Sequence, residues 1–197
     1  MLELTDQNFE ETVQNSQKPV LVDFWKSWCN PCLVLSPILE KIEKEYNDEI
    51  ILAKVNLDAS PLIALKFKIE QIPTVILFKY GMPISGFIGV KPEPAIKEWL
   101  GKSQEIINKV MEKVSEIIKN YQEHARKNGF RLNPDRKVVE RLVMGLLANE
   151  KKYGVRYCPC RRITGNPEED RKKICPCHWH KEEIEKDGHC CCSLFVK

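Results

Sequence analysis

Nine cysteines stand in two separate groups along the 197-residue chain. Cys29 and Cys32 belong to the motif Trp28-Cys29-Asn30-Pro31-Cys32, and the other seven cysteines lie between positions 158 and 192. In a reducing compartment, clustered cysteines are more often redox-active or metal-bound than paired in structural disulfides. The odd number of cysteines also excludes a framework in which every thiol is paired.

The first pair lies between an apolar strand, expected over residues 20–25, and a helix expected from Cys32. Backbone N–H groups and the helix dipole stabilise a thiolate at such a position, so they lower the pKa of Cys29 and make it nucleophilic. Cys32, one helical turn further on, can resolve a mixed disulfide by attacking its partner. A C-x-x-C motif alone could also be half of a zinc site.

The second group consists of three successive C-x-C pairs, at positions 158/160, 175/177 and 190/192. Residues two apart in an extended segment point to the same side, so each pair can present two sulfurs to one centre. The spacing differs from the C-x-x-C steps of zinc ribbons and bacterial ferredoxins. Four thiolates satisfy a [4Fe–4S] cluster, and the two remaining cysteines could form a disulfide against it.

Apolar periodicity predicts alternating strands and helices in the first hundred residues. Strands are expected over residues 20–25, 50–56, 74–79 and 84–88. Helices are expected over residues 8–15, 32–46, 62–67 and 92–100, the first capped by Thr5 or Asp6 and the second kinked at Pro37. Such alternation implies an α/β fold with a central sheet.

The α/β pattern is expected to end at Gly101-Lys102-Ser103, which would form a linker of about three residues. An apolar stripe then predicts a helix that ends at Asn128-Gly129, and Asn133-Pro134 predicts the start of another that ends at Gly154. Short helices and turns are expected to hold the remaining cysteines. The sequence therefore predicts two domains, residues 1–101 and residues 102–197.

The first domain resembles thioredoxin. The resemblance rests on Asp23-Phe24-Trp25, the Cys29/Cys32 motif, residues 53–58, Ile72-Pro73-Thr74 and Gly89, in order and at similar spacing. It implies a central mixed sheet flanked by helices, with Cys29 as the exposed attacking thiol and Cys32 as the buried resolving thiol. It also implies that Asp23 accepts a proton from Cys32, with Lys54 nearby, and that Pro73 is a cis proline beside the disulfide. Asn30 stands where the family has glycine.

The second domain resembles the catalytic subunit of ferredoxin:thioredoxin reductase, in its helical lead-in from about residue 104 and in its three cysteine pairs with their neighbours. The resemblance implies a smaller, mostly α-helical iron–sulfur domain, in which a [4Fe–4S] cluster is ligated by Cys158, Cys175, Cys177 and Cys190. It implies that Cys160 and Cys192 form a redox disulfide. Cys191 stands where the family has histidine, and His178, His180 and His189 are candidates for its role.

Charge is distributed unequally between the two predicted domains. Residues 1–102 hold 11 Lys/Arg and 14 Asp/Glu, a net charge of −3, whereas residues 103–197 hold 20 and 14, a net charge of +6. A basic half suits an acidic partner, and the resemblance implies ferredoxin or a similar acidic one-electron donor. Nucleic acid is the other acidic partner that a basic half can bind, but we expect none here. No apolar run approaches roughly 18 residues, so we expect no membrane partner. The N-terminus lacks a signal-peptide pattern, so a cytoplasmic location is expected.

Together the two resemblances predict an oxidoreductase that acts on disulfides. Single electrons would pass through the cluster and the Cys160–Cys192 disulfide to a thioredoxin disulfide, either in the chain's own first domain or in a separate thioredoxin or other target protein. The alternative is a zinc-binding redox sensor or adaptor that carries a thioredoxin domain. In that case histidines of the second domain would join cysteines around zinc.

Overall fold

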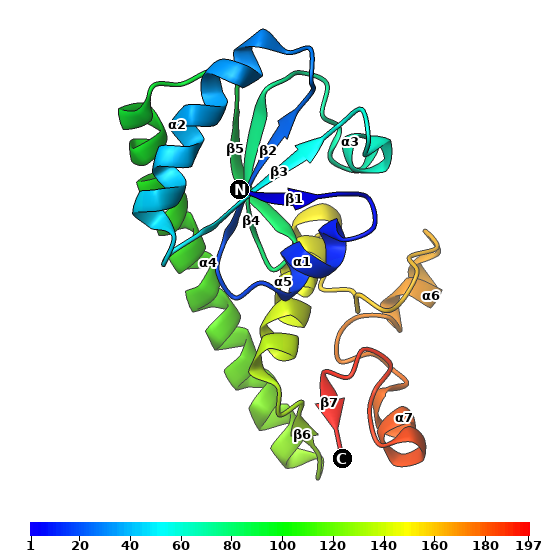
Figure 1. The fold of residues 1–197 in the computed structure, drawn as a ribbon. Helices are drawn as coiled ribbons and strands as arrows, with labels where there is room; N and C mark the ends of the chain where they lie inside the picture. The colour runs from blue at the N-terminus through cyan, green and yellow to red at the C-terminus, as the bar shows by residue number, and fades with distance from the viewer. The chain divides into compact units, whose positions relative to one another are not determined.

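The computed structural model describes all residues from 1 to 197, and the chain divides into two compact units, Met1–Lys109 and Val110–Lys197. The first unit alternates strands and helices, as the sequence predicts (Figure 1). In chain order its elements are β1 (Leu2–Leu4), α1 (Phe9–Asn15), β2 (Val20–Trp25), α2 (Asn30–Tyr46), β3 (Ile51–Asn56), α3 (Pro61–Phe67), β4 (Thr74–Lys79), β5 (Met82–Ile88) and the beginning of α4 (Glu93–Lys127).

The five strands form one mixed sheet in the order β1-β3-β2-β4-β5. Strand β3 runs parallel to β1 and β2, whereas β4 is antiparallel to both β2 and β5. Figure 1 shows α1 and α3 on one side of this sheet and α2 and α4 on the other. The predicted central mixed sheet flanked by helices is therefore confirmed; the short strand β1 was not predicted, and β5 begins two residues earlier than expected.

Four phenylalanines form the centre of the core between the sheet and helices α1 and α3. Phe9, Phe24, Phe67 and Phe78 have ring centroids 5.1–6.4 Å apart, in tilted and edge-to-face arrangements. Aromatic pairs prefer such geometries, which add to the stabilisation that burial provides. Because Phe24 and Phe78 lie on the central strands β2 and β4, this core holds the strand that leads into the first cysteine pair.

The predicted cap of the first helix is wrong. Asp6 instead accepts hydrogen bonds from the backbone N–H groups of Leu62 at 3.3 Å and Ile63 at 3.0 Å, at the start of α3. Those N–H groups have no partner within their own helix, so a carboxylate there satisfies them and interacts favourably with the helix dipole. Asp6 thus joins the N-terminal loop to a helix more than fifty residues away in the sequence.

The expected linker is also wrong, because residues 101–103 are helical. A single helix, α4, runs through them for 35 residues from Glu93 to Lys127. Glycine inside a helix costs about 1 kcal/mol, but the helix continues here through residues that make further contacts. Lys102 forms an ion pair with Glu98 one turn earlier, at 2.6 Å, and the Ser103 hydroxyl donates to the Trp99 carbonyl. The side chain of Ser103 is also buried.

The second unit contains the end of α4, helices α5 (Arg136–Tyr153), α6 (Pro167–Arg171) and α7 (His180–Asp187), and the short antiparallel strands β6 (Arg131–Leu132) and β7 (Phe195–Val196). Helix α5 starts two residues later than expected, and its N-cap is Asp135. Asn133 is used elsewhere: its side chain accepts from the Asp135 N–H and donates to the Ser193 carbonyl. The prediction that α5 ends at Gly154 is confirmed, as is the mostly helical class.

Aromatic side chains join the elements of the second unit. Phe195 of β7 lies against Tyr121, His124, Phe130 and His180, with ring centroids 5.4–5.8 Å apart. This cluster connects the last turns of α4 with the segments that carry the final two cysteine pairs. Across the whole chain, every helix is too short or too polar to cross a membrane.

Candidate redox sites

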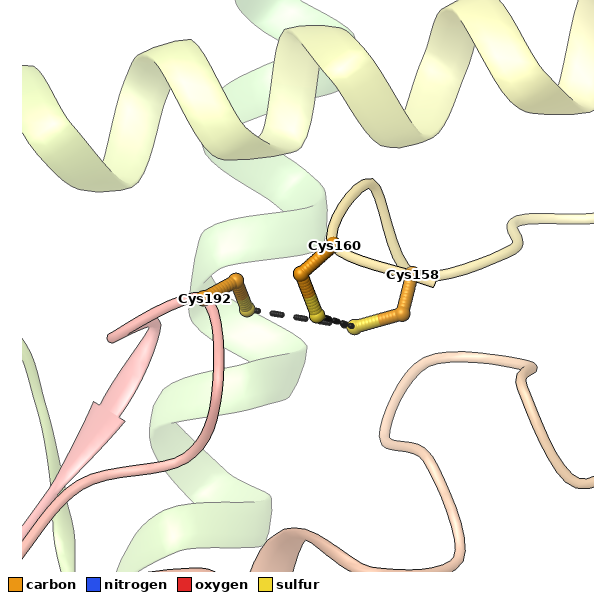
Figure 2. Close-up of side chains that lie close together, drawn as sticks. All are labelled: Cys158, Cys160 and Cys192. Carbon is orange, nitrogen blue, oxygen red and sulfur yellow. Dashed lines mark hydrogen bonds between the residues drawn. The ribbon is translucent and has the colours of Figure 1, made fainter. Parts of the chain in front are cut away.

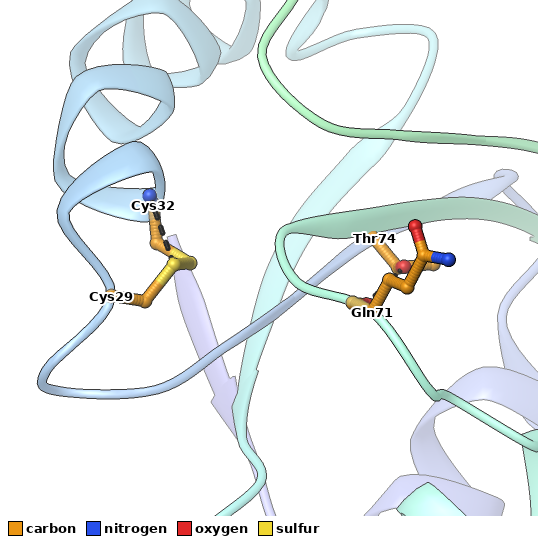
Figure 3. Close-up of a disulfide and its surroundings, with 4 residues drawn as sticks. All are labelled: Cys29, Cys32, Gln71 and Thr74. Atoms are coloured by element: carbon orange, nitrogen blue, oxygen red, sulfur yellow. Dashed lines mark hydrogen bonds between the residues drawn. A yellow bond between two sulfur atoms is a disulfide. The ribbon is translucent and has the colours of Figure 1, made fainter.

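The first site is a disulfide between Cys29 and Cys32 at the start of α2 (Figure 3). Cys29 is the N-cap residue, and its Sγ accepts a hydrogen bond from the Cys32 N–H at 3.2 Å. This is the helix-start position that stabilises a thiolate after reduction. The expectation that Cys29 is exposed is wrong for this oxidised state, in which the residue is 4 % exposed.

A loop lies beside the disulfide and carries the predicted cis proline. Figure 3 shows Gln71 and Thr74 of this loop next to the cysteine pair, and the Thr74 hydroxyl donates to the Gln71 carbonyl at 2.6 Å. The Ile72–Pro73 peptide bond between them is cis, as predicted. The Pro73 carbonyl accepts from the Gly89 N–H at 2.8 Å, which holds the loop against the end of β5.

Asp23 is the buried acid of this first site. It lies on β2 opposite Lys54 of β3 and is 3 % exposed, which rules out a solvent-facing carboxyl. Burial raises its pKa to about 7, and the positive charge of Lys54 counteracts part of that rise. A cavity of about 140 Å³ is lined by Asp23, Cys32 and Lys54. A carboxyl group that titrates near neutral pH beside a thiol can exchange protons with it.

The second site begins where two chain segments pair outside the named strands. The Cys158 N–H donates to the Lys173 carbonyl at 2.8 Å, and the Cys175 N–H donates to the Arg156 carbonyl at 2.9 Å. Tyr157 and Ile174 form an isolated antiparallel bridge between these two bonds. The pairing places the first two C-x-C motifs side by side although 15 positions separate them in the sequence.

The third C-x-C motif is held in a tight loop before β7. The Cys190 N–H donates to the Phe195 carbonyl at 2.9 Å, and the Ser193 N–H donates to the Cys190 carbonyl at 2.7 Å. The Phe195 N–H in turn donates to the Cys190 Sγ at 3.3 Å. Backbone N–H donors of this kind stabilise negative charge on the sulfur, as a metal-bound thiolate requires.

The three motifs bring their thiols together. Cys158 Sγ lies 3.7 Å from Cys160 Sγ and 3.8 Å from Cys192 Sγ, as Figure 2 shows. Cys192 Sγ is also 3.8 Å from Cys190 Sγ. The three sulfurs of Cys158, Cys160 and Cys192 all lie within 4.8 Å of one another. Cys158 also interacts with the thiols of the second pair, Cys175 and Cys177.

Exposure divides these cysteines into two classes. The four predicted cluster ligands are buried, whereas Cys160 is exposed and Cys192 is half-buried. Four buried thiols are the ligand type and number that a [4Fe–4S] cluster takes, so the residues present fit that group. All seven cysteines of this unit are free thiols in the structure. The Cys160–Cys192 disulfide therefore stays a prediction, and the two sulfurs lie within 4.8 Å of each other, whereas a disulfide bond is about 2 Å long.

The local environment also favours the thiolate form of Cys160. Its hydrogen-bond interactions with the thiols of Cys158 and Cys192 lower its pKa, and the positive charge of Arg161 acts in the same direction. The hydrogen bonds to its neighbours raise the pKa of Cys158. An exposed thiol with a lowered pKa is chemically suited to act as a nucleophile.

Sequence reasoning missed the contribution of Glu183. Its carboxylate accepts a hydrogen bond from the Cys191 N–H at 2.9 Å and forms an ion pair with Arg161. The Arg161 guanidinium also lies over the ring of Trp179, 4.9 Å from its centroid. Glu183 thus connects the loop that carries Cys160 to the loop that carries Cys192. Nothing in the spacing of the motifs indicates this contact, because Glu183 lies on a different element, α7.

The histidines considered for the role at position 191 do not lie in the close group of sulfurs. His180 Nδ1 is 2.6 Å from the Cys177 carbonyl oxygen, and its Nε2 is 3.1 Å from Nε2 of His124. His189 Nδ1 is 3.0 Å from the Cys190 carbonyl oxygen. His178 is exposed and lies edge-on to Trp179. Cys191 itself is exposed and interacts with the Cys160 thiol.

The comparison with known families agrees with this two-part architecture. Residues 1–102 match the thioredoxin family. The chain belongs to the thioredoxin family. Residues 105–197 match a second family, described as ferredoxin thioredoxin reductase catalytic beta chain. The thioredoxin region is thus followed by a reductase region, and the chain is an oxidoreductase that acts on disulfides.

Individual relatives match about half of the chain. The thioredoxin of Buchnera aphidicola subsp. Acyrthosiphon pisum is 45% identical over 103 residues, which are 52% of this chain and 95% of that protein. The thioredoxin of Alicyclobacillus acidocaldarius is 43% identical over 97 residues, 49% of this chain and 91% of that protein. A protein of Mycobacterium leprae described as bifunctional thioredoxin reductase/thioredoxin is 42% identical over 95 residues, 48% of this chain and 21% of that protein.

Proposed function

We propose that this chain reduces disulfides with single electrons that enter through a [4Fe–4S] cluster held by Cys158, Cys175, Cys177 and Cys190. The electrons come from ferredoxin or a similar acidic protein. In this proposal the thioredoxin domain spans residues 1–101 and the reductase domain spans residues 102–197. The protein works in the cytoplasm, where the target disulfide is that of its own thioredoxin domain or of a separate protein.

The proposal rests mainly on the difference in exposure among the cysteines of the second site. The four assigned ligands are buried, whereas Cys160 is open to solvent next to them. A bound cluster supplies one electron at a time. The reduction of a disulfide needs two electrons, so an adjacent thiol pair is required to hold the half-reduced state. Cys160 and Cys192 are suited to this role because their sulfurs lie within 4.8 Å of each other.

The side chains of this site then perform ordinary thiol–disulfide exchange. Cys160 Sγ attacks one sulfur of the target disulfide and forms a mixed disulfide, and the other target sulfur leaves as a thiolate. Cys192 afterwards attacks Cys160, re-forms the Cys160–Cys192 bond and releases the second target thiol. In the thioredoxin domain we assign Cys29 as the sulfur that Cys160 attacks. Asp23 exchanges the proton of Cys32, since both line one cavity.

Metal analysis separates this function from that of a zinc-binding redox sensor or adaptor. Protein purified without oxygen should be brown and contain about four iron and four sulfide per chain. Replacement of a buried ligand by Cys175→Ala should lower the iron content, whereas Cys191→Ser, at an exposed neighbour, should leave it unchanged. Colourless protein with one zinc and no iron would show that the alternative is correct.

An activity assay tests the assignment of the nucleophile. Reduced ferredoxin is added to the oxidised protein, and new thiols at Cys29 and Cys32 are measured by alkylation and mass spectrometry. Cys160→Ser should keep its iron but form no thiols there. The matched variant Cys191→Ser should form them as the unmodified protein does. If Cys160→Ser still reduces the Cys29–Cys32 disulfide, Cys160 is not the nucleophile and the proposal is wrong.

A further inference from the structure

Cys191 is a thiol to which the proposed function gives no part. Its neighbours Cys190 and Cys192 are buried and half-buried, whereas Cys191 is open to solvent. An exposed free thiol is accessible to oxidants, and for that reason a designed protein surface avoids one. Here the exposed thiol stands beside a second exposed thiol, that of Cys160.

The proximity of these two thiols is built into the backbone around them. The thiols of Cys160 and Cys191 interact with each other. The Glu183 carboxylate accepts a hydrogen bond from the Cys191 N–H at 2.9 Å and forms an ion pair with Arg161, the residue that follows Cys160. One buried-edge contact therefore connects the segment that carries one exposed thiol to the segment that carries the other.

Cys192 is placed differently from Cys191. Its sulfur lies 3.8 Å from Cys158 Sγ and 3.8 Å from Cys190 Sγ, and both of these cysteines are buried (Figure 2 shows the first of these contacts). Cys160 thus has one thiol neighbour that lies among buried sulfurs and another that is exposed. A small oxidant in solution has the most direct access to Cys160 and Cys191.

We infer that Cys160 and Cys191 form a reversible oxidation site for hydrogen peroxide. The Cys160 sulfur attacks one peroxide oxygen, the O–O bond breaks, and the products are a sulfenic acid at Cys160 and one water molecule. The Cys191 sulfur then attacks the Cys160 sulfur, which forms a Cys160–Cys191 disulfide and releases a second water molecule. The two thiols lose two electrons and two protons, and these convert one hydrogen peroxide into two water molecules.

The disulfide protects Cys160 from irreversible damage. Without a neighbouring thiol, a sulfenic acid is oxidised further to a sulfinic acid, which thiols do not reduce. The Cys192 thiol can later attack the Cys160 sulfur, which forms the Cys160–Cys192 disulfide and releases Cys191. Only this last step rests on the proposed function, in which the Cys160–Cys192 disulfide is reduced again. The oxidation itself needs neither the electron donor nor a target protein.

The test uses variants of the full chain in which Cys192 cannot take part. Cys192→Ser leaves Cys191 as the exposed partner of Cys160, and the matched variant Cys191→Ser/Cys192→Ser removes that partner too. Both proteins are purified without oxygen, compared for iron content, freed of reductant and treated with hydrogen peroxide. Mass spectrometry of proteolytic fragments measures disulfide and sulfinic acid at Cys160, before and after treatment with a thiol reductant.

In Cys192→Ser, Cys160 should be found in a disulfide that the reductant converts back to thiols. In Cys191→Ser/Cys192→Ser, the sulfinic acid at Cys160 should be roughly tenfold more abundant after the same treatment. Equal amounts of sulfinic acid in the two variants would overturn the inference, and so would a Cys160 that stays unoxidised in both.

A third variant separates this result from the proposed function. Cys191→Ser retains Cys160 and Cys192, so peroxide should still produce the Cys160–Cys192 disulfide in it. If this variant forms no disulfide at Cys160 while Cys192→Ser does, the redox pair of the proposed function is wrong and the oxidation site stands. If Cys191→Ser forms the disulfide and Cys192→Ser does not, the oxidation site is wrong and the redox pair stands.

Discussion

The carboxylate of Glu183 accepts a hydrogen bond from the backbone N–H of Cys191 at 2.9 Å. The same carboxylate forms an ion pair with Arg161. One side chain of α7 therefore contacts the residue that follows Cys160 and the residue that precedes Cys192. The contact ties two loops whose relative position decides whether those two sulfurs can react. Glu183 is therefore a positioning residue for the proposed redox pair.

Removal of this carboxylate should impair both stability and disulfide reduction. Glu183→Ala leaves the Cys191 N–H and the Arg161 guanidinium without their partner, which should lower the free energy of unfolding by about 1–3 kcal/mol. Displaced thiols should also reduce the rate roughly tenfold or more. Glu183→Gln keeps an acceptor for the Cys191 N–H, so its stability and its rate should lie between those of Glu183→Ala and those of the unmodified protein. Thermal unfolding and the ferredoxin assay measure these effects.

The neighbouring exposed residue provides the control. Glu182 lies on the same helix and is exposed, so Glu182→Ala should change stability by less than about 0.5 kcal/mol. Equal losses in the Glu182 and Glu183 variants would contradict the positioning role.

The free energy of unfolding of the first unit should decrease as the pH rises, because of Asp23. Its pKa of about 7 in the folded protein exceeds the ordinary value of 3.8, so the folded state binds this proton more tightly than the unfolded chain does. The stabilisation is complete below about pH 4 and is lost as the pH rises to 7. Asp23→Asn should abolish this slope and raise the free energy of unfolding at pH 8 by up to about 4 kcal/mol.

Denaturant unfolding of the oxidised protein at several pH values, followed by tryptophan fluorescence, measures the Asp23 effect. Asp48→Asn, at an exposed acid of the same unit, should retain the slope of the unmodified protein. An Asp23→Asn profile that still falls between pH 4 and 7 would show that another group causes the dependence.

The transfer step should be trapped when the resolving thiol is removed. In Cys32→Ser, the Cys29 thiolate can attack the Cys160 sulfur of the proposed Cys160–Cys192 disulfide, which forms a Cys29–Cys160 disulfide and releases the Cys192 thiolate. No Cys32 thiol is then present to resolve this mixed disulfide. Partial reduction followed by peptide mapping should therefore find a Cys29–Cys160 linkage. Cys29→Ser should yield none. A linkage from Cys29 to Cys191 instead would assign the attack to the neighbouring exposed thiol.

The phenylalanine core should be costly to disturb. Phe78 is fully buried among three other rings, so Phe78→Ala should lower the free energy of unfolding by about 3–5 kcal/mol. Ile88 is 57 % exposed, and Ile88→Ala should change stability much less. Denaturant unfolding of both variants measures the difference, and similar values for the two would contradict the assignment of Phe78 to the core.

The sheet and the first cysteine site follow from local sequence signals. The strand at Val20–Trp25 is continuously apolar except for Asp23, and the Cys29/Cys32 motif directly precedes a helix, so both could be predicted from neighbouring residues. The cis proline at Pro73 was predicted from the thioredoxin resemblance. The role of Asp6 could not be predicted in this way, because its partners at Leu62 and Ile63 depend on the packing of distant elements.

The second unit was less predictable because its site also depends on contacts between segments that are distant in the sequence. The three C-x-C pairs are visible in the sequence, but their thiols meet through backbone bonds such as that from Cys158 to Lys173, which no periodicity indicates. The contact of Glu183 with Cys191 is also tertiary. The linker predicted at Gly101 was wrong for a different reason. Glycine often ends a helix, but here the helix continues because Leu100 and Ile107 are both buried and extend its apolar face.

The unbroken α4 has a practical consequence for work on the isolated halves. The regions that match the two families meet near residues 102–105, which lie in the interior of this helix. A protein truncated there would end or begin within a helix, with up to four carbonyl or four N–H groups deprived of their backbone partners. Fragments for separate expression should therefore overlap, each retaining the complete helix from Glu93 to Lys127.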